Sequence, residues 1–384
     1  MSWYKDTLGE VSEKIQTGPF GSQLHQSDYR DEGVPVIMPK DMLEGRISTL
    51  SIARISKEHV ERLNQHKVKS GDIIYSRRGD VGKCALITNK EEGWLCGTGC
   101  LKVTLNPNKI IPKFAFYQLQ RKESIGWLIN HAVGSTMLNL NTSILTKLPI
   151  EITDLDKQQS IVNVLASYDD LIENNQKQIE LLEESAQRLY KEWFVDLRFP
   201  GHENVEIIDG IPVEWEYLEF LDIAPIITGK KDANFSSENG KYLFFTCSQQ
   251  PLLAESYSYD CDAVILAGNG DFNVKLYRGK FEAYQRTYVL SPYKTEHLYL
   301  LFYTIKNRMN YLIQGASGST IKFLTKGMIA DIKVLVPTCE ILNQYNEIAE
   351  SLQRQLEVLT YQNKLLTEAR DRLLPKLMSG EIEV

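Results

Sequence analysis

The chain has 384 residues, of which 43% are hydrophobic and 24% charged, with a net charge of −7 and six cysteines. These values are ordinary for a soluble globular protein, and the cysteines lack the spacing of a disulfide framework. The sequence has no run of about 18 apolar residues and no apolar signal core near its start. A cytoplasmic protein without membrane contact is therefore expected.

The charge is unevenly distributed along the chain. The first 150 residues contain 20 Lys and Arg against 15 Asp and Glu, whereas residues 151–204 contain 5 against 12. The negative charge is thus concentrated in a stretch that reads as helical. An acidic overall balance does not exclude a nucleic-acid partner for the globular parts.

The first predicted domain, residues 1–152, consists of short β-like runs separated by turns. Strands are predicted at 72–76 and 83–87, on either side of the turn Arg78-Gly79-Asp80. Residues 113–129 have one apolar face and are predicted to form a helix.

Residues 153–200 are predicted to form one long helix, beginning with a capping box at Thr153 and ending before Pro200. From Ile161 to Trp193, core-type residues recur in alternating steps of four and three, which is the period of a coiled-coil seam. This seam is about 48 Å long. It includes Ile161, Leu165, Ile172, Asn175, Ile179, Leu182 and Leu189. A helix with such a stripe needs a partner helix.

The second predicted domain, residues 201–338, repeats the first. Residues 69–74 align with 259–264, and residues 132–136 align with 316–320, before each long helix. In this alignment Arg77-Arg78 corresponds to Ala267-Gly268. Residues 297–313 are predicted to form a helix, and each copy has an α+β texture.

Residues 339–384 are predicted to hold the second spacer helix and a C-terminal tail. Adding 187 to the first seam gives Ile348, Leu352, Leu359, Gln362, Leu366 and Leu373. Asn175 is thereby matched with Gln362, and a buried amide pair would fix the register of an antiparallel coiled coil. The alternative is that each helix packs separately on a globular core. The predicted fold class is α+β, with two pseudo-repeated globular domains joined by two long antiparallel coiled-coil helices.

Three groups of residues resemble the specificity subunits of type I restriction–modification enzymes. They are Thr17–Ser22, Gly71–Gly79 and the Gly-Ser-Thr before each helix, which resemble target-recognition domains, while Leu374–Ile382 resembles a conserved spacer region. The resemblance covers essentially the whole chain. It implies a non-catalytic subunit that reads an asymmetric split target on double-stranded DNA, one half per domain. The paired helices would set the gap and dock two methyltransferase subunits.

The same resemblance implies that this chain has no cofactor of its own, because S-adenosylmethionine is expected on the methyltransferase subunits. A restriction (endonuclease/translocase) subunit is a further partner that it allows. Arg77 and Arg78, at a strand-end turn, suit bidentate contact with guanine, the alternative being an exposed surface pair. The full set expected at DNA is Ser22, Lys40, Arg77, Arg78, Gly79, Ser135, Thr136, Asn139, Lys230, Lys231, Asn234, Asn269, Ser319, Thr320 and Lys322.

Catalytic motifs are weak in this sequence. Cys96 and Cys100 lack a second pair of zinc ligands and are expected to be buried thiols. Asp72 and Asp80 flank the two arginines, but the second copy does not reproduce a nuclease-like set. Two alternatives stay open: a stand-alone nuclease or methyltransferase with a divergent centre, and a structural coiled-coil adaptor.

Overall fold

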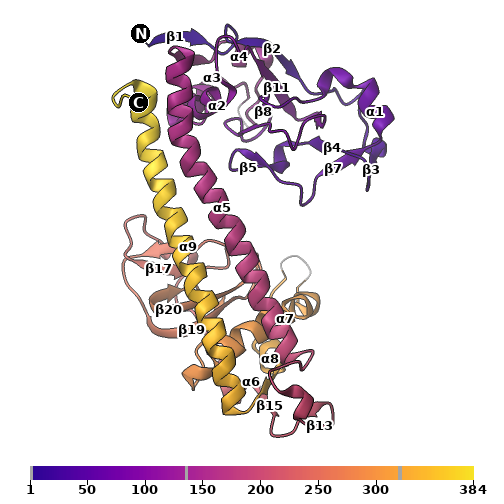
Figure 1. The fold of residues 1–384 in the computed structure, drawn as a ribbon, viewed down its shortest axis with the longest axis vertical. Coiled ribbons are helices and arrows are strands. Elements are labelled where there is room, and N and C mark those ends of the chain that lie inside the picture. Colours follow the sequence, from indigo (N-terminus) through magenta and orange to yellow (C-terminus); the bar gives the residue numbers. More distant parts are fainter. Residues whose placement is uncertain (1–2, 135–136, 319–321) are drawn as a thin grey trace. The chain divides into compact units, whose positions relative to one another are not determined.

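The computed structural model describes residues 3–134, 137–318 and 322–384. The chain divides into two compact units, residues 1–173 with 363–384 (unit 1) and residues 174–362 (unit 2). Each unit contains one globular region together with parts of the two longest helices, α5 (Leu155–Phe194) and α9 (Cys339–Ser379) (Figure 1). The predicted mixture of helices and strands is confirmed.

Unit 1 is built around an antiparallel four-stranded sheet with the order β2-β11-β8-β9. A second sheet has the order β10-β4-β7-β3, and the pairs β1-β12 and β5-β6 complete the strands. The bounds are Tyr4–Thr7 (β1), Ser12–Thr17 (β2), Tyr29–Arg30 (β3), Val34–Ile37 (β4), Met42–Leu43 (β5), Arg46–Ile47 (β6), Ala53–Ile55 (β7), Ile73–Ser76 (β8), Cys84–Leu86 (β9), Leu95–Cys96 (β10), Cys100–Leu105 (β11) and Pro149–Ile152 (β12). β8 is buried along its whole length, as its apolar run Ile-Ile-Tyr requires.

The helices of unit 1 differ from the prediction at one place. A single helix was predicted over 113–129, but the chain forms α2 (Pro112–Leu119) and α3 (Lys122–His131). Arg121 has an extended backbone between them, and the Ser124 hydroxyl donates to the Gln118 carbonyl oxygen. The remaining helices, apart from α5, are α1 (Lys57–Arg62) and α4 (Thr142–Thr146).

Unit 2 contains a six-stranded sheet with the order β16-β21-β19-β20-β17-β18, and the two-stranded pairs β13-β14 and β15-β22. The strands are Ile207–Ile208 (β13), Ile211–Pro212 (β14), Glu216–Glu219 (β15), Ile227–Thr228 (β16), Tyr242–Phe245 (β17), Leu252–Ala254 (β18), Tyr259–Ala267 (β19), Val274–Ala283 (β20), Thr287–Leu290 (β21) and Lys333–Val336 (β22). The helices besides α9 are α6 (Phe220–Ile223), α7 (Leu298–Gly315) and α8 (Lys326–Ala330).

The two globular regions repeat the same strand arrangement. β2, β11 and β8 of unit 1 are antiparallel neighbours, as are β16, β21 and β19 of unit 2. The registers agree: Cys100 faces Ser76 in one, and Thr287 faces Ala267 in the other. This register sets the offset between β8 and β19 at 191, one residue more than the sequence alignment gave. Arg77 therefore corresponds to Gly268 and Arg78 to Asn269.

The long helices pair within each unit. In unit 1, Arg370 of α9 forms an ion pair with Asp169 of α5 at 2.9 Å. In unit 2, the Asn175 amide of α5 donates to Gln362 of α9 at 3.5 Å. Residue numbers rise along α5 as those of its partner fall, so both pairings are antiparallel. The ends of the helices also enter the globular cores, with Ile161 and Tyr345 as fully buried examples.

The residues of α9 that face inward differ from the predicted seam at every second position, where the residue one place later in the chain is the inward one. The predicted seam residues on α5 are buried or half-buried, as are Leu352, Leu359, Leu366 and Leu373. Ile348, however, is 42% exposed and Gln362 is also exposed, whereas the next residues, Ala349 and Asn363, face inward. The inward series on α9 is Leu342, Tyr345, Ala349, Leu352, Leu356, Leu359, Asn363, Leu366, Arg370, Leu373 and Leu377. These still follow steps of three and four, so a constant offset of 187 selected the wrong neighbour at every second position.

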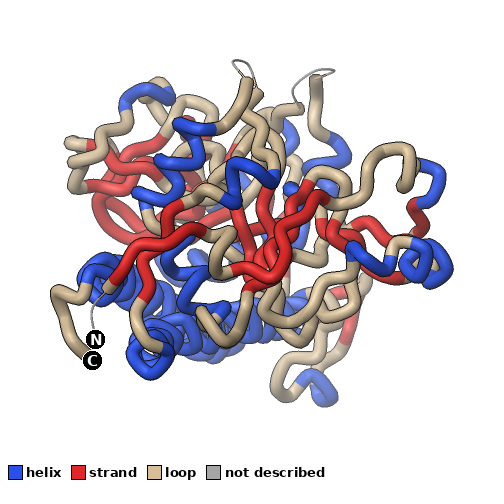
Figure 2. Tube along the Cα trace, turned by 90° about the horizontal axis from the view of Figure 1, so that it is seen from above, coloured by secondary structure: helices blue, strands red, loops and turns tan. Residues whose placement is uncertain are grey.

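The first described residues and the C-terminal tail lie together in unit 1 (Figure 2). Trp3 packs so closely against Gly380 that a Cβ there would lie 2.5 Å from the Trp3 Nε1. Gly380 has a φ of +75, in the left-handed region that favours glycine. The C-terminal tail after α9 is thus anchored on the first globular region, where Lys157 also pairs with Glu383 at 3.6 Å.

Candidate nucleic-acid interface

Several loops of unit 1 meet at one end of the main sheet. β2 ends at Thr17, β8 ends at Ser76 and β11 begins at Cys100, and the antiparallel registers place these ends together. Backbone hydrogen bonds join the loops that follow. Gly18 donates to the Cys100 oxygen at 2.9 Å, and Arg77 donates to the Gly99 oxygen at 2.9 Å. A rigid sheet end carrying exposed loops is a common way to present binding residues.

Arg77, Arg78, Gly79 and Asn139 are brought together at this sheet end. Arg78 and Asn139 form an antiparallel β-bridge, and the Leu140 amide donates to the Arg77 oxygen at 2.8 Å. Gly79 has a φ of +75, a conformation that L side chains rarely adopt. Its backbone therefore sets the direction of the turn that carries the arginines.

The two arginine side chains have different surroundings. Arg78 is exposed, whereas Arg77 is half-buried. The Nε of Arg77 is shielded from solvent and has no hydrogen-bond partner within the described residues. A buried guanidinium nitrogen without a partner is costly, and an acceptor on a bound molecule would relieve that cost.

Two other predicted residues of unit 1 lie near the same loops. Lys40 follows Pro39, whose ring would lie 3.0 Å from a Cβ at Gly99. The Lys40 ammonium donates to the Ser51 carbonyl oxygen at 2.8 Å, so it is held by its own loop. Ser22 is exposed in the loop after β2. Ser135 and Thr136 lie outside the described residues.

Unit 2 repeats three of the backbone hydrogen bonds of this loop cluster. Gly229 donates to the Thr287 oxygen at 2.9 Å, as Gly18 does to Cys100. Gly268 donates to the Arg286 oxygen at 2.9 Å, as Arg77 does to Gly99. Further equivalents are Leu324 N to Gly268 O at 2.8 Å, the bridge between Asn269 and Phe323, and the positive φ of Gly270 (+67). The scaffold is shared, but the side chains on it differ.

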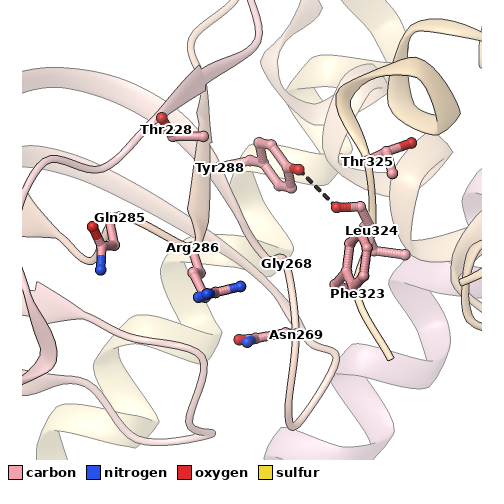
Figure 3. Close-up of a pocket in the computed structure, with 9 residues that line it drawn as sticks. All are labelled: Thr228, Gly268, Asn269, Gln285, Arg286, Tyr288, Phe323, Leu324 and Thr325. Carbon is pink, nitrogen blue, oxygen red and sulfur yellow. Dashed lines mark hydrogen bonds between the residues drawn. The ribbon is translucent and has the colours of Figure 1, made fainter. Parts of the chain in front are cut away.

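A cavity of about 410 Å³ opens in this cluster of unit 2 (Figure 3). The Tyr288 hydroxyl donates to the Leu324 oxygen at 2.8 Å and closes one wall. Figure 3 shows the side chains of Arg286 and Asn269 directed into the opening. The set of DNA contacts expected from the sequence includes Asn269 but leaves out Arg286, although the stretch Tyr284 to Arg286 is a candidate for a place near DNA.

The remaining predicted residues of unit 2 lie close in sequence to residues that line this cavity, or outside the described residues. Lys230 is exposed directly after the β16 end, and Lys322 is exposed beside Phe323. Lys231 is less available, because its ammonium lies 4.4 Å from the centre of the Phe235 ring. Asn234 is exposed in the short 3₁₀ turn that also contains Phe235. Ser319 and Thr320 lie outside the described residues.

Groups with possible catalytic chemistry have structural roles. The buried Asp72 accepts hydrogen bonds from the Lys69 amide at 2.8 Å and the Thr104 hydroxyl at 2.7 Å. Cys84, Cys96 and Cys100 are buried free thiols, and burial raises the pKa of Cys84 to about 12. In residues 3–134, 137–318 and 322–384, no group of three His, Cys, Asp or Glu side chains is placed to hold a metal ion. Over those same ranges no helix has the length and apolar character needed to cross a membrane.

Polar clusters fix the long helices to the globular regions. In unit 1 the Tyr117 hydroxyl donates to Asp169 at 2.5 Å, and Arg370 pairs with the same carboxylate. Burial and the hydrogen bond to Asp169 together raise the pKa of Tyr117 well above its ordinary value. In unit 2, Glu350 of α9 accepts hydrogen bonds from Arg278 of β20 at 3.2 and 3.3 Å.

Comparison with known proteins places these features in a family. The profile described as "Type I restriction modification DNA specificity domain" matches residues 2–184 and 212–368. The specificity subunit of the type I restriction enzyme EcoDI from Escherichia coli is 38% identical over 181 residues, which are 45% of this chain and 39% of that protein. This chain therefore matches well under half of that relative.

Two further comparisons cover nearly the whole chain. The MjaIX specificity subunit from Methanocaldococcus jannaschii is 25% identical over 390 residues, covering 93% of this chain and 88% of that protein. The crystal structure of a type I restriction–modification S subunit from M. genitalium superposes with a TM-score of 0.63. It covers 98% of this chain and 96% of that chain at 20% identity, and so supports the fold.

Proposed function

This chain belongs to the family of type I restriction modification DNA specificity domains, and we propose that it reads an asymmetric two-part DNA target, one half with each globular region. DNA sequence recognition follows from the family. The division into half-sites is supported by the repeated loop cluster of each unit.

This proposal rests on one observation: the two loop clusters share their backbone hydrogen bonds but carry different side chains. Three pairs of backbone hydrogen bonds recur, yet Arg77 is replaced by Gly268 and Arg78 by Asn269. Base edges are read by side chains, whereas the backbone of a recognition loop mainly sets their position. One scaffold with two sets of side chains therefore predicts two different half-sites.

The long helices are proposed to set the distance between the half-sites and to dock two methyltransferase subunits. Exposed apolar side chains on α9 support the docking role: Val358 is 54% exposed and Tyr361 is 60% exposed. They are three residues apart and so share one helix face. Tyrosine at such a position is typical of the buried centre of a protein interface.

Methyl transfer is assigned to the partner subunits, which would bind S-adenosylmethionine and act with this chain on DNA in the cytoplasm. A restriction subunit would join the same complex. The charged loops of this chain would bind the DNA and fix its position relative to the complex. Arg77, Arg78 and Asn139 would contact the first half-site, while Lys230 and Lys322 would hold phosphates of the second.

The test uses the chain in complex with its methyltransferase partner. Arg77→Ala with Arg78→Ala is compared with Arg30→Ala, which removes an exposed charge from β3. The double variant is expected to lose or relax methylation preference in one half-site only, with the other half unchanged. Equal loss of preference in both half-sites, or none, would contradict the division of labour.

A further inference from the structure

We propose that Arg286 is a base-reading residue of the second globular region and selects a guanine in its half-site. This inference rests on the proposed function and adds the identity of one base. Arg286 precedes β21 and lines the cavity described above, together with Asn269 and Gln285. Guanine is the base whose O6 and N7 acceptors match the two-pronged guanidinium in the major groove.

The backbone of Arg286 is fixed, while its side chain is free. Its carbonyl oxygen accepts from the Gly268 amide at 2.9 Å and from the Cys247 thiol at 3.5 Å. Among the residues that the structure describes, its exposed guanidinium has no hydrogen-bond or ion-pair partner. The anchored turn is therefore preorganised, and it presents an unpaired guanidinium to a ligand that supplies acceptors.

The neighbouring side chains favour a base over a phosphate as that ligand. Phe323 and Tyr288 give the cavity apolar walls, and the Asn269 amide supplies a second donor and acceptor (Figure 3). Flat apolar surfaces with a few directed polar groups suit a base edge. Phosphates are instead expected at the exposed ammonium groups of Lys230 and Lys322, which do not line the cavity.

The comparison with unit 1 strengthens this assignment. Arg286 is equivalent to Gly99, whereas Arg77 and Arg78 of unit 1 are equivalent to Gly268 and Asn269. The arginine thus lies on one loop in one unit and on the facing loop in the other. An arginine that binds a phosphate in both units would be expected at the same position in each. Arginines that specify different bases can instead lie at different positions.

The experiment measures methylation of a duplex library, randomised across both half-sites, by the complex of the full chain with its methyltransferase. Wild type is compared with Arg286→Ala, Arg286→Lys and the matched control Arg308→Ala, an exposed arginine of α7 outside this cavity. With Arg286→Ala, the preference for guanine at one position is expected to fall about 5- to 150-fold. The other half-site and the control should keep wild-type preferences.

Wild-type complex on duplexes containing 7-deazaguanine gives a second readout that does not depend on the folding of a variant. Loss of the N7 acceptor at the selected position of the half-site should lower methylation, while the same replacement in the unread spacer should not. A uniform fall over all sequences with unchanged preference would show a phosphate contact and overturn the proposal, as would an unchanged profile. If wild type itself shows no sequence preference, the proposed function fails instead.

Discussion

Asn175 of α5 donates a hydrogen bond to the side-chain oxygen of Gln362 on α9, at 3.5 Å. The next residue of α9, Asn363, faces the first helix more directly and donates to the Ile172 carbonyl oxygen at 3.3 Å. The Oδ1 of Asn363 is buried without a partner among the described residues. The pairing of the helices therefore contains more than one amide, and one of them is only half satisfied.

Replacing Asn363 by Leu is expected to stabilise the protein by about 1 kcal/mol, because it removes a buried acceptor that lacks a donor. A polar residue at a seam position fixes the register of the paired helices and lowers their stability. Urea unfolding of the variant gives the change. The substitution Lys364→Leu, at the next position of α9, which is exposed, should change the free energy of unfolding by no more than about 0.5 kcal/mol. Equal effects at both positions would argue against the inward placement of Asn363.

The carboxylate of Asp169 holds two partners, Tyr117 and Arg370. Asp169→Ala leaves the Tyr117 hydroxyl without its acceptor, whereas Arg370 keeps its ion pair with Asp371 at 2.8 Å. We expect a loss of about 1–3 kcal/mol in the free energy of unfolding. Asp170→Ala removes an exposed carboxylate one residue away and serves as the control. Comparable melting curves for the two variants would show that the cluster contributes little.

Acid is expected to loosen the attachment of α9 to unit 2. The hydrogen bond from Arg278 holds the pKa of Glu350 below its ordinary value of 4.5. A lowered folded-state pKa means that the stabilisation is complete above the unfolded-state value and is lost as pH falls through the folded-state value. Glu350→Gln should therefore be less stable than wild type at neutral pH, with the difference shrinking below about pH 4.5. A difference that stays constant with pH would contradict this linkage.

Removing one heptad from each long helix tests the spacing role. Deleting residues 172–178 and 359–365 shortens each helix by about 10 Å while keeping the seam in phase. The gap between the half-sites should then shrink by about three base pairs, taking 3.4 Å per base pair. Both half-site sequences should stay the same. Deleting the heptad from α5 alone breaks the pairing and should abolish methylation, and an unchanged gap in the double deletion would refute the spacing role.

The order of globular regions and long helices could be predicted from the sequence, because periodic patterns of apolar residues and repeated motifs indicate it. The seam from Ile161 to Trp193 predicts α5, and the motif around Arg78 predicts the strand-end turn. The face of α9 that is directed inward could not be predicted, because Ile348 and Ala349 are both apolar and only packing decides which of them is buried. Arg286 is absent from the set of DNA contacts expected from the sequence for a related reason, since its place at the cavity depends on a strand register that sets it opposite Gly268. The contact of Tyr117 with Asp169 joins residues that no local pattern relates.

The most direct test of the central claim is a map of DNA methylation in cells that make this chain with its neighbouring methyltransferase, against cells that lack only this chain. The account predicts a methylated motif with two different halves separated by a fixed unread gap, and its disappearance without the chain. Identical methylation in both cells would contradict the assignment of DNA reading to this protein.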